Sequence, residues 1–290
     1  MAAAQEIKKI ALILSGGLSR GAAHIAFANE IVKRVGLERI CLIAGASIGA
    51  INAYSLAVGH GDELISIYRN LDCDSTGHFI KKIRNDLYND TFNHLEDELK
   101  VPTYVTVTNA VGFNCNYYCL NHMARKDLKS CINSSMSFPI INGPHRFSGH
   151  ITLDGGATDN IPVYPAIHFD PDMVIILHCY SRYYPPEFLF ENLRKDCIVV
   201  DVDVSLNFER KITPFSFEKT DFEMMLDQGK LDGEEFVSKI FSDFYVENVR
   251  QRTYKYINEK MILRRGKSWN GFLELVEMLN ALYQIKEGRF

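Results

Sequence analysis

Short apolar runs alternate with amphipathic stretches at the start of the chain. Residues 10–14 and 39–44 are apolar runs of strand length, typical of strands buried on both faces of a parallel sheet. Residues 22–35 and 48–58 have helical spacing of apolar side chains, and Gly36 and Gly59 close them. The order strand, helix, strand, helix predicts a mostly parallel sheet covered by helices on both faces, a three-layer α/β/α sandwich.

The same reading extends to the rest of the chain. Residues 62–100 look helical and polar, with a loop around 72–77, and 127–136 and 162–169 are further helix candidates. Strands are predicted at 104–108, 115–120, 173–177 and 197–202, the first two joined by Val111-Gly-Phe. From residue 220 onward the pattern is helical, with a break near Gly266. We expect a main domain over 5–205 and a helical part, 206–290, packed on the same domain.

Composition excludes several classes of protein. The chain has 290 residues, of which 47% are hydrophobic and 23% charged, which is ordinary for a globular protein. The net charge of −4 gives no basic excess, so no nucleic-acid partner is expected. No stretch has the roughly 20 apolar residues of a membrane-spanning helix. The N-terminus lacks a secretory pattern, and seven scattered cysteines suit a reducing compartment, so a cytoplasmic location is expected.

The first motif with chemistry is Gly45-Ala-Ser47-Ile-Gly49, between a predicted strand and a predicted helix. In that context GxSxG is a nucleophile elbow, because small residues allow a tight turn that exposes the serine hydroxyl. The N-terminus of the following helix also favours negative charge there. The alternative is that Ser47 only caps the helix.

A glycine-rich segment, residues 15–21 (Ser-Gly-Gly-Leu-Ser-Arg-Gly), follows the first predicted strand. A dinucleotide-binding GxGxxG would need glycine where Leu18 stands, and a phosphate-binding P-loop would need a lysine that is absent. The remaining interpretations are an oxyanion hole built from backbone N–H groups, or a plain strand-to-helix turn.

The third motif is Asp154-Gly-Gly156. Asp-Gly by itself commonly marks a tight turn. Together with the other two motifs, Asp154 supplies the base that Ser47 needs. Asn160, before Ile-Pro162, is predicted to cap a helix whose first turn contains the proline.

Taken together and in order, these segments resemble the patatin-like phospholipase family. The family's glycine loop corresponds to residues 15–21, followed by Ala23-His24, and its G-x-S-x-G-A elbow to residues 45–50. Its Ser-x-x-x-Pro stretch, DGG turn and N-x-P correspond to 135–139, 154–156 and 160–162. Leu18 departs from the pattern, since the family has a third glycine there, and leucine disfavours positive φ.

The resemblance implies a lipid acyl hydrolase with a Ser47–Asp154 dyad that cleaves carboxylic esters through an acyl-enzyme. It implies a phospholipid or another acyl-ester lipid as substrate, peripheral contact with a membrane, and no cofactor or metal. The backbone N–H groups of the glycine loop would form the oxyanion hole: Gly16, Gly17 and Leu18. The remaining motif residues would support the site: Arg20, Gly21, Gly45, Gly49, Gly155, Gly156 and Asn160.

Several alternatives remain at this point. The same dyad would also serve a thioesterase or a transacylase, and a catalytically silent lipid-binding protein would keep the fold. A Ser–His–Asp triad would need His168 or His178, the histidines that follow Asp154. An aspartate of ordinary pKa, about 3.9, predicts activity that survives below pH 6.

Two apolar segments bear on substrate binding. The aromatic stretch 180–190 is a candidate flap over an acyl channel, or a loop pinned to the core. The amphipathic stretch 222–244 is predicted to form core and not a membrane-facing surface.

Overall fold

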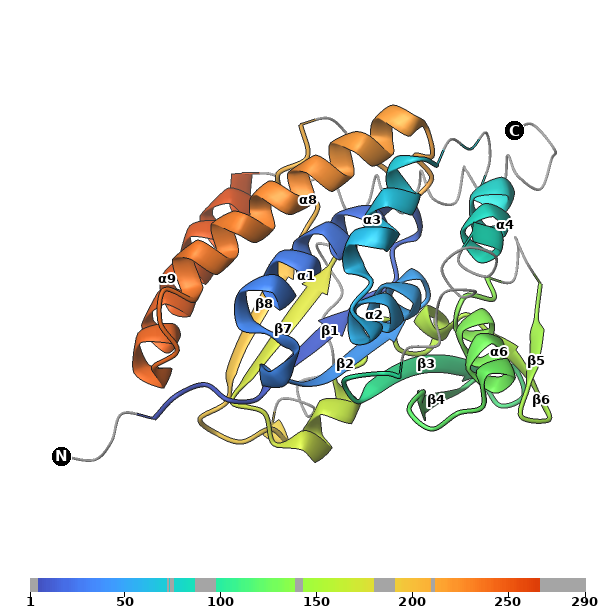
Figure 1. The fold of residues 1–290 in the computed structure, drawn as a ribbon, viewed down its shortest axis with the longest axis horizontal. Helices are drawn as coiled ribbons and strands as arrows, with labels where there is room; N and C mark the ends of the chain where they lie inside the picture. Colours follow the sequence, from blue (N-terminus) through green and yellow to red (C-terminus); the bar gives the residue numbers. More distant parts are fainter. Residues whose placement is uncertain are drawn as a thin grey trace.

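The computed structural model describes residues 5–71, 73, 76–86, 98–138, 143–179, 191–209 and 212–266, and its centre is an eight-stranded sheet (Figure 1). The strand order is β5-β6-β3-β2-β1-β7-β8, with β4 also paired to β3. The strands are β1 (Ile10–Leu14), β2 (Ile40–Ala46), β3 (Thr103–Asn109), β4 (Asn114–Cys119), β5 (His145–Phe147), β6 (His150–Leu153), β7 (Met173–His178) and β8 (Ile198–Asp203).

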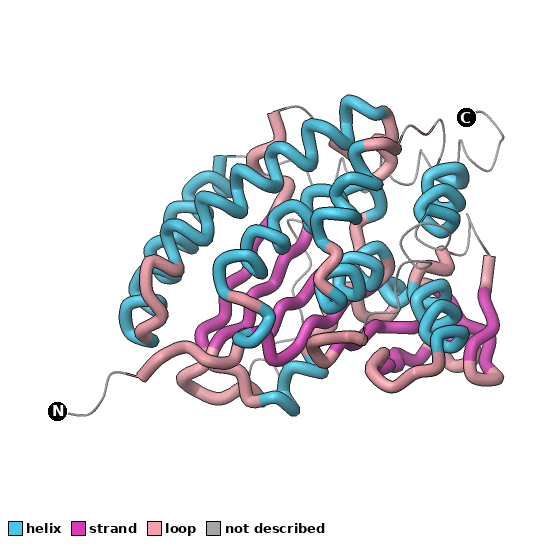
Figure 2. The backbone as a smooth tube through the Cα atoms, viewed as in Figure 1, coloured by secondary structure: helices cyan, strands magenta, loops and turns pink. Residues whose placement is uncertain are grey.

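The central five strands, β3, β2, β1, β7 and β8, are parallel, whereas β4, β5 and β6 join by antiparallel pairing. The α-helices are α1 (Gly21–Val35), α2 (Ile48–Val58), α3 (Gly61–Arg69), α4 (Thr76–Asp86), α6 (Arg125–Ser135), α8 (Lys219–Ile240) and α9 (Val246–Gly266). The expected mostly parallel sheet flanked by helices is confirmed, and Figure 2 shows the strands as a layer against the helices.

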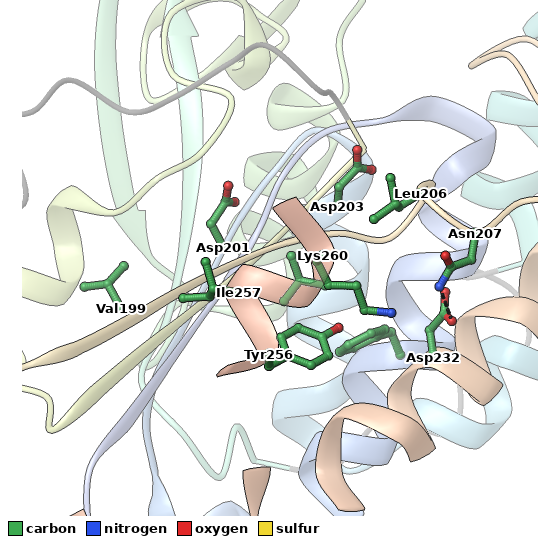
Figure 3. Close-up of a pocket in the computed structure, with 11 residues that line it drawn as sticks. Val199, Asp201, Asp203, Leu206, Asn207, Asp232, Tyr256, Ile257 and Lys260 are labelled. Atoms are coloured by element: carbon green, nitrogen blue, oxygen red, sulfur yellow. Dashed lines mark hydrogen bonds between the residues drawn. The ribbon is translucent and has the colours of Figure 1, made fainter. Parts of the chain in front are cut away.

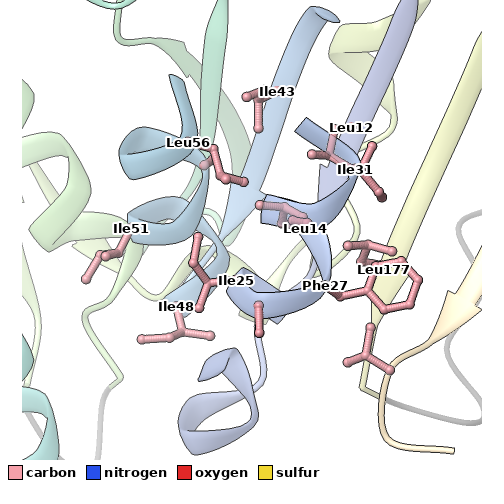
Figure 4. Close-up of a cluster of buried hydrophobic side chains, with 14 of the residues drawn as sticks. Leu12, Leu14, Ile25, Phe27, Ile31, Ile43, Ile48, Ile51, Leu56 and Leu177 are labelled. Carbon is pink, nitrogen blue, oxygen red and sulfur yellow. The ribbon is translucent and has the colours of Figure 1, made fainter. Parts of the chain in front are cut away.

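Side-chain alternation along β1 divides the core between the two faces of the sheet. Ile10, Leu12 and Leu14 join the large cluster under α1, α2, α3 and α8, part of which is drawn in Figure 4. Ala11 and Ile13 belong to a smaller cluster on the other face. There the short 3-10 helix Tyr164–Phe169 covers the sheet. Because both faces are buried, the strand must be apolar at every position, which is the pattern the sequence shows.

Helix α8 packs closely along α1, because two glycines face the partner backbone. A Cβ placed on Gly229 would lie 2.5 Å from the carbonyl oxygen of Ala23, and one on Gly233 would lie 3.0 Å from that of Phe27. Phe222, the first apolar residue of the amphipathic stretch, is fully buried, as are most of its other apolar side chains. The prediction that this stretch forms core is therefore confirmed.

Three sequence expectations need correction. The short hairpin of β5 and β6 was not predicted, because strands of three and four residues carry too little periodicity to stand out. The helix expected over 162–169 is a 3-10 helix that begins at Tyr164. Helix α8 ends at Ile240, so Phe244 lies beyond it, before α9 begins.

Among the described residues, no helix is both long enough and apolar enough to cross a bilayer.

Candidate active site

Ser47 occupies a strained single-residue turn between β2 and α2. Its φ of 52° and ψ of −125° lie outside the ordinary regions for a non-glycine residue. Backbone segments pass each other closely there. A Cβ on Gly45 would lie 2.2 Å from the carbonyl oxygen of Gly49, and a Cβ on Gly49 would lie 2.4 Å from that of Leu14. Only glycine fits at these two positions, so both glycines of the motif are required by the geometry.

The side chain of Ser47 is hydrogen-bonded to Asp154. Ser47 Oγ donates to Asp154 Oδ2 at 2.6 Å, although the two residues are 107 positions apart in sequence. Ser47 stands at the N-cap position of α2, but its hydroxyl does not cap the helix. The capping interpretation is therefore wrong, and the hydroxyl is held by a carboxylate within proton-transfer distance.

The segment that ends α6 holds both members of this pair. The backbone N–H of Ser47 donates to Ser135 Oγ at 3.0 Å. The backbone N–H of Asp154 donates to the carbonyl oxygen of Ser137 at 2.8 Å. The sequence motif 135–139 signalled this segment without revealing its role, and Pro139 itself lies outside the described residues.

Asp154 is almost fully buried, and this sets its acidity. Its Oδ1 accepts the backbone N–H of Gly156 at 2.8 Å. Burial raises the pKa of Asp154 to about 6, and the hydrogen bonds from Ser47 and Gly156 oppose that rise only in part. Asp154 is therefore a weaker acid than the solvated aspartate on which the expectation of activity below pH 6 was based.

Close packing fixes the turn after Asp154. A Cβ on Gly155 would lie 2.1 Å from the carbonyl oxygen of Thr106, in β3. Thr108, two residues further along β3, donates from Oγ1 to the carbonyl oxygen of Asp154 at 2.7 Å. The turn is thus pressed against a central strand, which holds the carboxylate in place.

The glycine loop lies directly beside Ser47. A Cβ on Gly16 would come within 3.0 Å of Ser47 Cβ. The N–H of Gly16 donates to Asn160 Oδ1 at 3.1 Å, so it is already engaged. Asn160 therefore holds the glycine loop and does not cap a helix, which corrects the sequence expectation. Within the described residues no acceptor is found for the N–H groups of Gly17 and Leu18.

Leu18 adopts a backbone conformation that glycine takes far more readily than leucine. Its φ is 51°, in the left-handed region, despite the side chain. The left-handed conformation costs a leucine about 1–2 kcal/mol of strain.

Arg20 fastens the loop to the rest of the molecule. Its buried guanidinium donates to the carbonyl oxygens of Cys179, after β7, at 2.8 Å and of Ile212 at 2.5 Å. At Gly21 a Cβ would come 2.5 Å from Ile48 Cγ1, so a glycine is needed where α1 passes α2. Both residues thus support the loop and do not face the dyad.

The two histidines considered as alternative bases lie in other environments. Buried His178 contacts Asp201, with Nε2 2.7 Å from Oδ1, and the ring of His168 packs edge-on against Tyr164. Ser47 Oγ is bonded to Asp154 instead. Neither histidine is the hydrogen-bond partner of Ser47 Oγ, which is Asp154.

A cavity of about 230 Å³ lies elsewhere, between β8, α8 and α9 (Figure 3). Val202, Tyr256 and Asp232 are among its lining residues, and neither the dyad nor the glycine loop contributes to it. The aromatic stretch 180–190, the candidate flap over an acyl channel, lies outside the described residues.

Comparisons with known proteins show which family this chain resembles. The family model described as patatin-like phospholipase matches residues 12–167. An uncharacterized NTE family protein of Mycobacterium tuberculosis is 27% identical over 179 residues, 58% of this chain and 48% of its own. Neuropathy target esterase sws of Drosophila sechellia is 27% identical over 172 residues, 53% of this chain and 11% of its own.

The chain thus spans about half the length of the mycobacterial relative and a small part of the insect one. The crystal structure of VipD from Legionella pneumophila aligns with a TM-score of 0.46 and 11% identity, over 96% of this chain and 80% of that one. The family model covers more than half of the chain and includes the elbow, the glycine loop and the DGG turn, so the protein belongs to the patatin-like phospholipase family.

Proposed function

We propose that the protein is a lipid acyl hydrolase that cleaves carboxylic esters with a Ser47–Asp154 dyad. The observation that carries this proposal is the 2.6 Å hydrogen bond from Ser47 Oγ to a buried carboxylate, at a strained turn between β2 and α2. Membership of the patatin-like phospholipase family supports a lipid ester as the substrate class. The catalytic unit would be residues 5–205, with α8 and α9 of the following part packed on it.

The first half of the reaction forms an acyl-enzyme. The Asp154 carboxylate accepts the hydroxyl proton as Ser47 Oγ bonds to the ester carbonyl carbon. The negative charge that develops on the carbonyl oxygen is received by the N–H groups of Gly17 and Leu18, and by the N-terminus of α2. When the tetrahedral intermediate collapses, the C–O bond breaks and the leaving alcohol takes the proton from Asp154.

The second half releases the acid. Asp154 accepts a proton from water, whose oxygen attacks the acyl carbon; the bond between that carbon and Ser47 Oγ then breaks, and the proton from Asp154 restores the Ser47 hydroxyl. A carboxylate with a pKa near 6 is a stronger base than a solvated aspartate, yet it is ionised at neutral pH. Burial of Asp154 therefore suits it to act without a histidine.

The direct test is covalent labelling with a fluorophosphonate probe, read by intact mass. Wild type and a control variant at an exposed serine of α3, Ser66→Ala, are expected to gain one label. Ser47→Ala and Asp154→Asn are expected to gain none while remaining folded. Labelling of Ser47→Ala at the wild-type rate would refute the dyad, and absence of labelling in folded wild type would favour the catalytically silent lipid-binding protein.

A substrate panel then separates the related chemistries. Phospholipids, soluble p-nitrophenyl esters and acyl thioesters are compared, each with and without an acceptor alcohol. Fatty acid released from phospholipid, with no preference for thioesters and no ester formed on the acceptor, supports a hydrolase. Acyl transfer to the alcohol, or turnover confined to thioesters, would replace it by the transacylase or the thioesterase.

A further inference from the structure

Exposed apolar side chains gather at one place on the described surface. Val111 and Phe113, in the turn between β3 and β4, are 72% and 58% exposed, and Ile151 on β6 is 38% exposed. The N–H of Ala110 donates to the carbonyl oxygen of Ile151 at 2.9 Å, so the turn and β6 are in contact. We call Val111, Phe113 and Ile151 the apolar tip. Of seven large apolar side chains exposed in the described residues, three belong to it.

The backbone of the turn is built to hold these side chains outward. The N–H of Val111 is fixed by Asn109 Oδ1 at 2.9 Å. Gly112 and Phe113 both have positive φ, 86° and 51°. The left-handed conformation is unfavourable for a bulky aromatic residue, and exposure of its ring to water adds a second cost. Strain of this kind persists at sites where the conformation serves a function.

The apolar tip lies at the same end of the sheet as Ser47 and Asp154, because Ser47 follows β2 and the turn follows the parallel strand β3. Leu153 at the end of β6 pairs with Thr108 of β3, and Asp154 follows directly. Ile151 precedes Asp154 by three residues of extended chain, which is roughly 10 Å. In Figure 1, β5 and β6 lie at one end of the molecule beside α6, whose last turn carries Ser135.

The one formally charged side chain in the two segments that form the apolar tip is positive, Arg146, in contrast to the net −4 of the chain. Residues 110–116 and 143–153 contain no aspartate or glutamate. Exposed Arg146 stands opposite Ile151 in the β5–β6 ladder, and within the described residues no carboxylate forms an ion pair with it. Apolar side chains beside an arginine, on segments that carry no carboxylate, complement an anionic lipid surface.

We propose that the apolar tip docks the protein on an anionic lipid bilayer, with Val111 and Phe113 inserted among the lipid headgroups and Arg146 against lipid phosphate. Docking there would turn the carboxyl ends of β2 and β3, where Ser47 lies, toward the membrane. A lipid ester would then reach the dyad without crossing water. The inference rests on the proposed function for its purpose, but the binding itself is measured separately.

The test is co-sedimentation of the full chain with vesicles of phosphatidylcholine, alone or with about a third phosphatidylglycerol. Val111→Asp and Phe113→Asp are expected to lower the partition coefficient on anionic vesicles by about tenfold or more each, since each replaces an inserted apolar group by a charge. Arg146→Gln is expected to weaken binding to the anionic vesicles alone. Matched controls place the same charge at exposed positions on α9 and α8, Tyr254→Asp and Leu231→Asp, and should bind as wild type does.

The outcomes separate this inference from the proposed function. Vesicle binding that depends on the apolar tip, in a protein that hydrolyses no ester, would support the docking surface and refute the proposed hydrolase function. Hydrolysis of vesicle phospholipid by Phe113→Asp as fast as by wild type would refute the docking proposal. So would vesicle binding that none of the tip variants changes, absence of binding to anionic vesicles, or a dimer in gel filtration that Phe113→Asp dissociates. Thermal midpoints equal to that of wild type ensure that loss of binding is not loss of fold.

Discussion

Replacing Asp154 with asparagine should make the protein more stable at neutral pH while it abolishes ester cleavage. The buried carboxylate has a pKa of about 6 in the folded chain, against 3.8 for the ordinary group. A shift of about two units corresponds to about 3 kcal/mol, by which ionised Asp154 lowers the free energy of unfolding. Asparagine removes the charge and keeps an oxygen for the N–H of Gly156 and a polar partner for Ser47.

The sign of the pH dependence is fixed by the direction of the shift. Because the folded pKa lies above the unfolded one, the protonated form favours folding, and wild type loses that stability as the pH rises from about 4 to about 6. Asp154→Asn does not titrate there. Its advantage over wild type should therefore be small near pH 4, grow to about 3 kcal/mol by about pH 6 and stay constant above.

Urea unfolding of both proteins at a series of pH values measures this difference. Asp172→Asn is the control of opposite sign, because Arg194 and the N–H groups of Lys8 and Lys9 lower the pKa of Asp172. That variant should be less stable than wild type at neutral pH. If Asp154→Asn were no more stable than wild type at about pH 7.5, or its advantage did not change with pH, the account of Asp154 as a desolvated base would fail.

Four further predictions follow from the site. Turnover of a soluble ester should fall below about pH 6 as Asp154 is protonated, and a midpoint below pH 5 would contradict the raised pKa. Ser135→Ala leaves the buried N–H of Ser47 without its acceptor, and urea unfolding should show a loss of about 1–3 kcal/mol. Leu18→Ile should slow fluorophosphonate labelling, because a β-branched residue tolerates positive φ less well, whereas Leu18→Gly should label at least as fast as wild type. Gly49→Ala sets a Cβ 2.4 Å from the Leu14 carbonyl oxygen and should lower the melting temperature sharply; an unchanged midpoint would show that the elbow relaxes.

Sequence patterns predicted the central strands and helices because their periodicity is imposed by burial. The strand 10–14 and the helix 48–58 were predicted with the bounds that the structure has. Every residue of both elements is buried, so burial sets their pattern from end to end. The strands β5 and β6 were not predicted. Because Ile151 lies on β6, the sequence did not reveal that the apolar tip forms one surface. Their short pairing is decided by contact with β3 and not by local preference.

At the site, the sequence by itself determined which residues are candidates for catalysis, because a tight turn admits few residue types and the three motifs stand in a recognisable order. Gly45, Ser47 and Gly49 follow from that local constraint. Only the tertiary structure decided how those residues behave. Burial by segments distant in the sequence raises the pKa of Asp154. Asn160 accepts a hydrogen bond from the N–H of Gly16 but not from those of Gly17 and Leu18. Acidity and hydrogen-bond partnership depend on groups that folding brings together, and no local pattern records them.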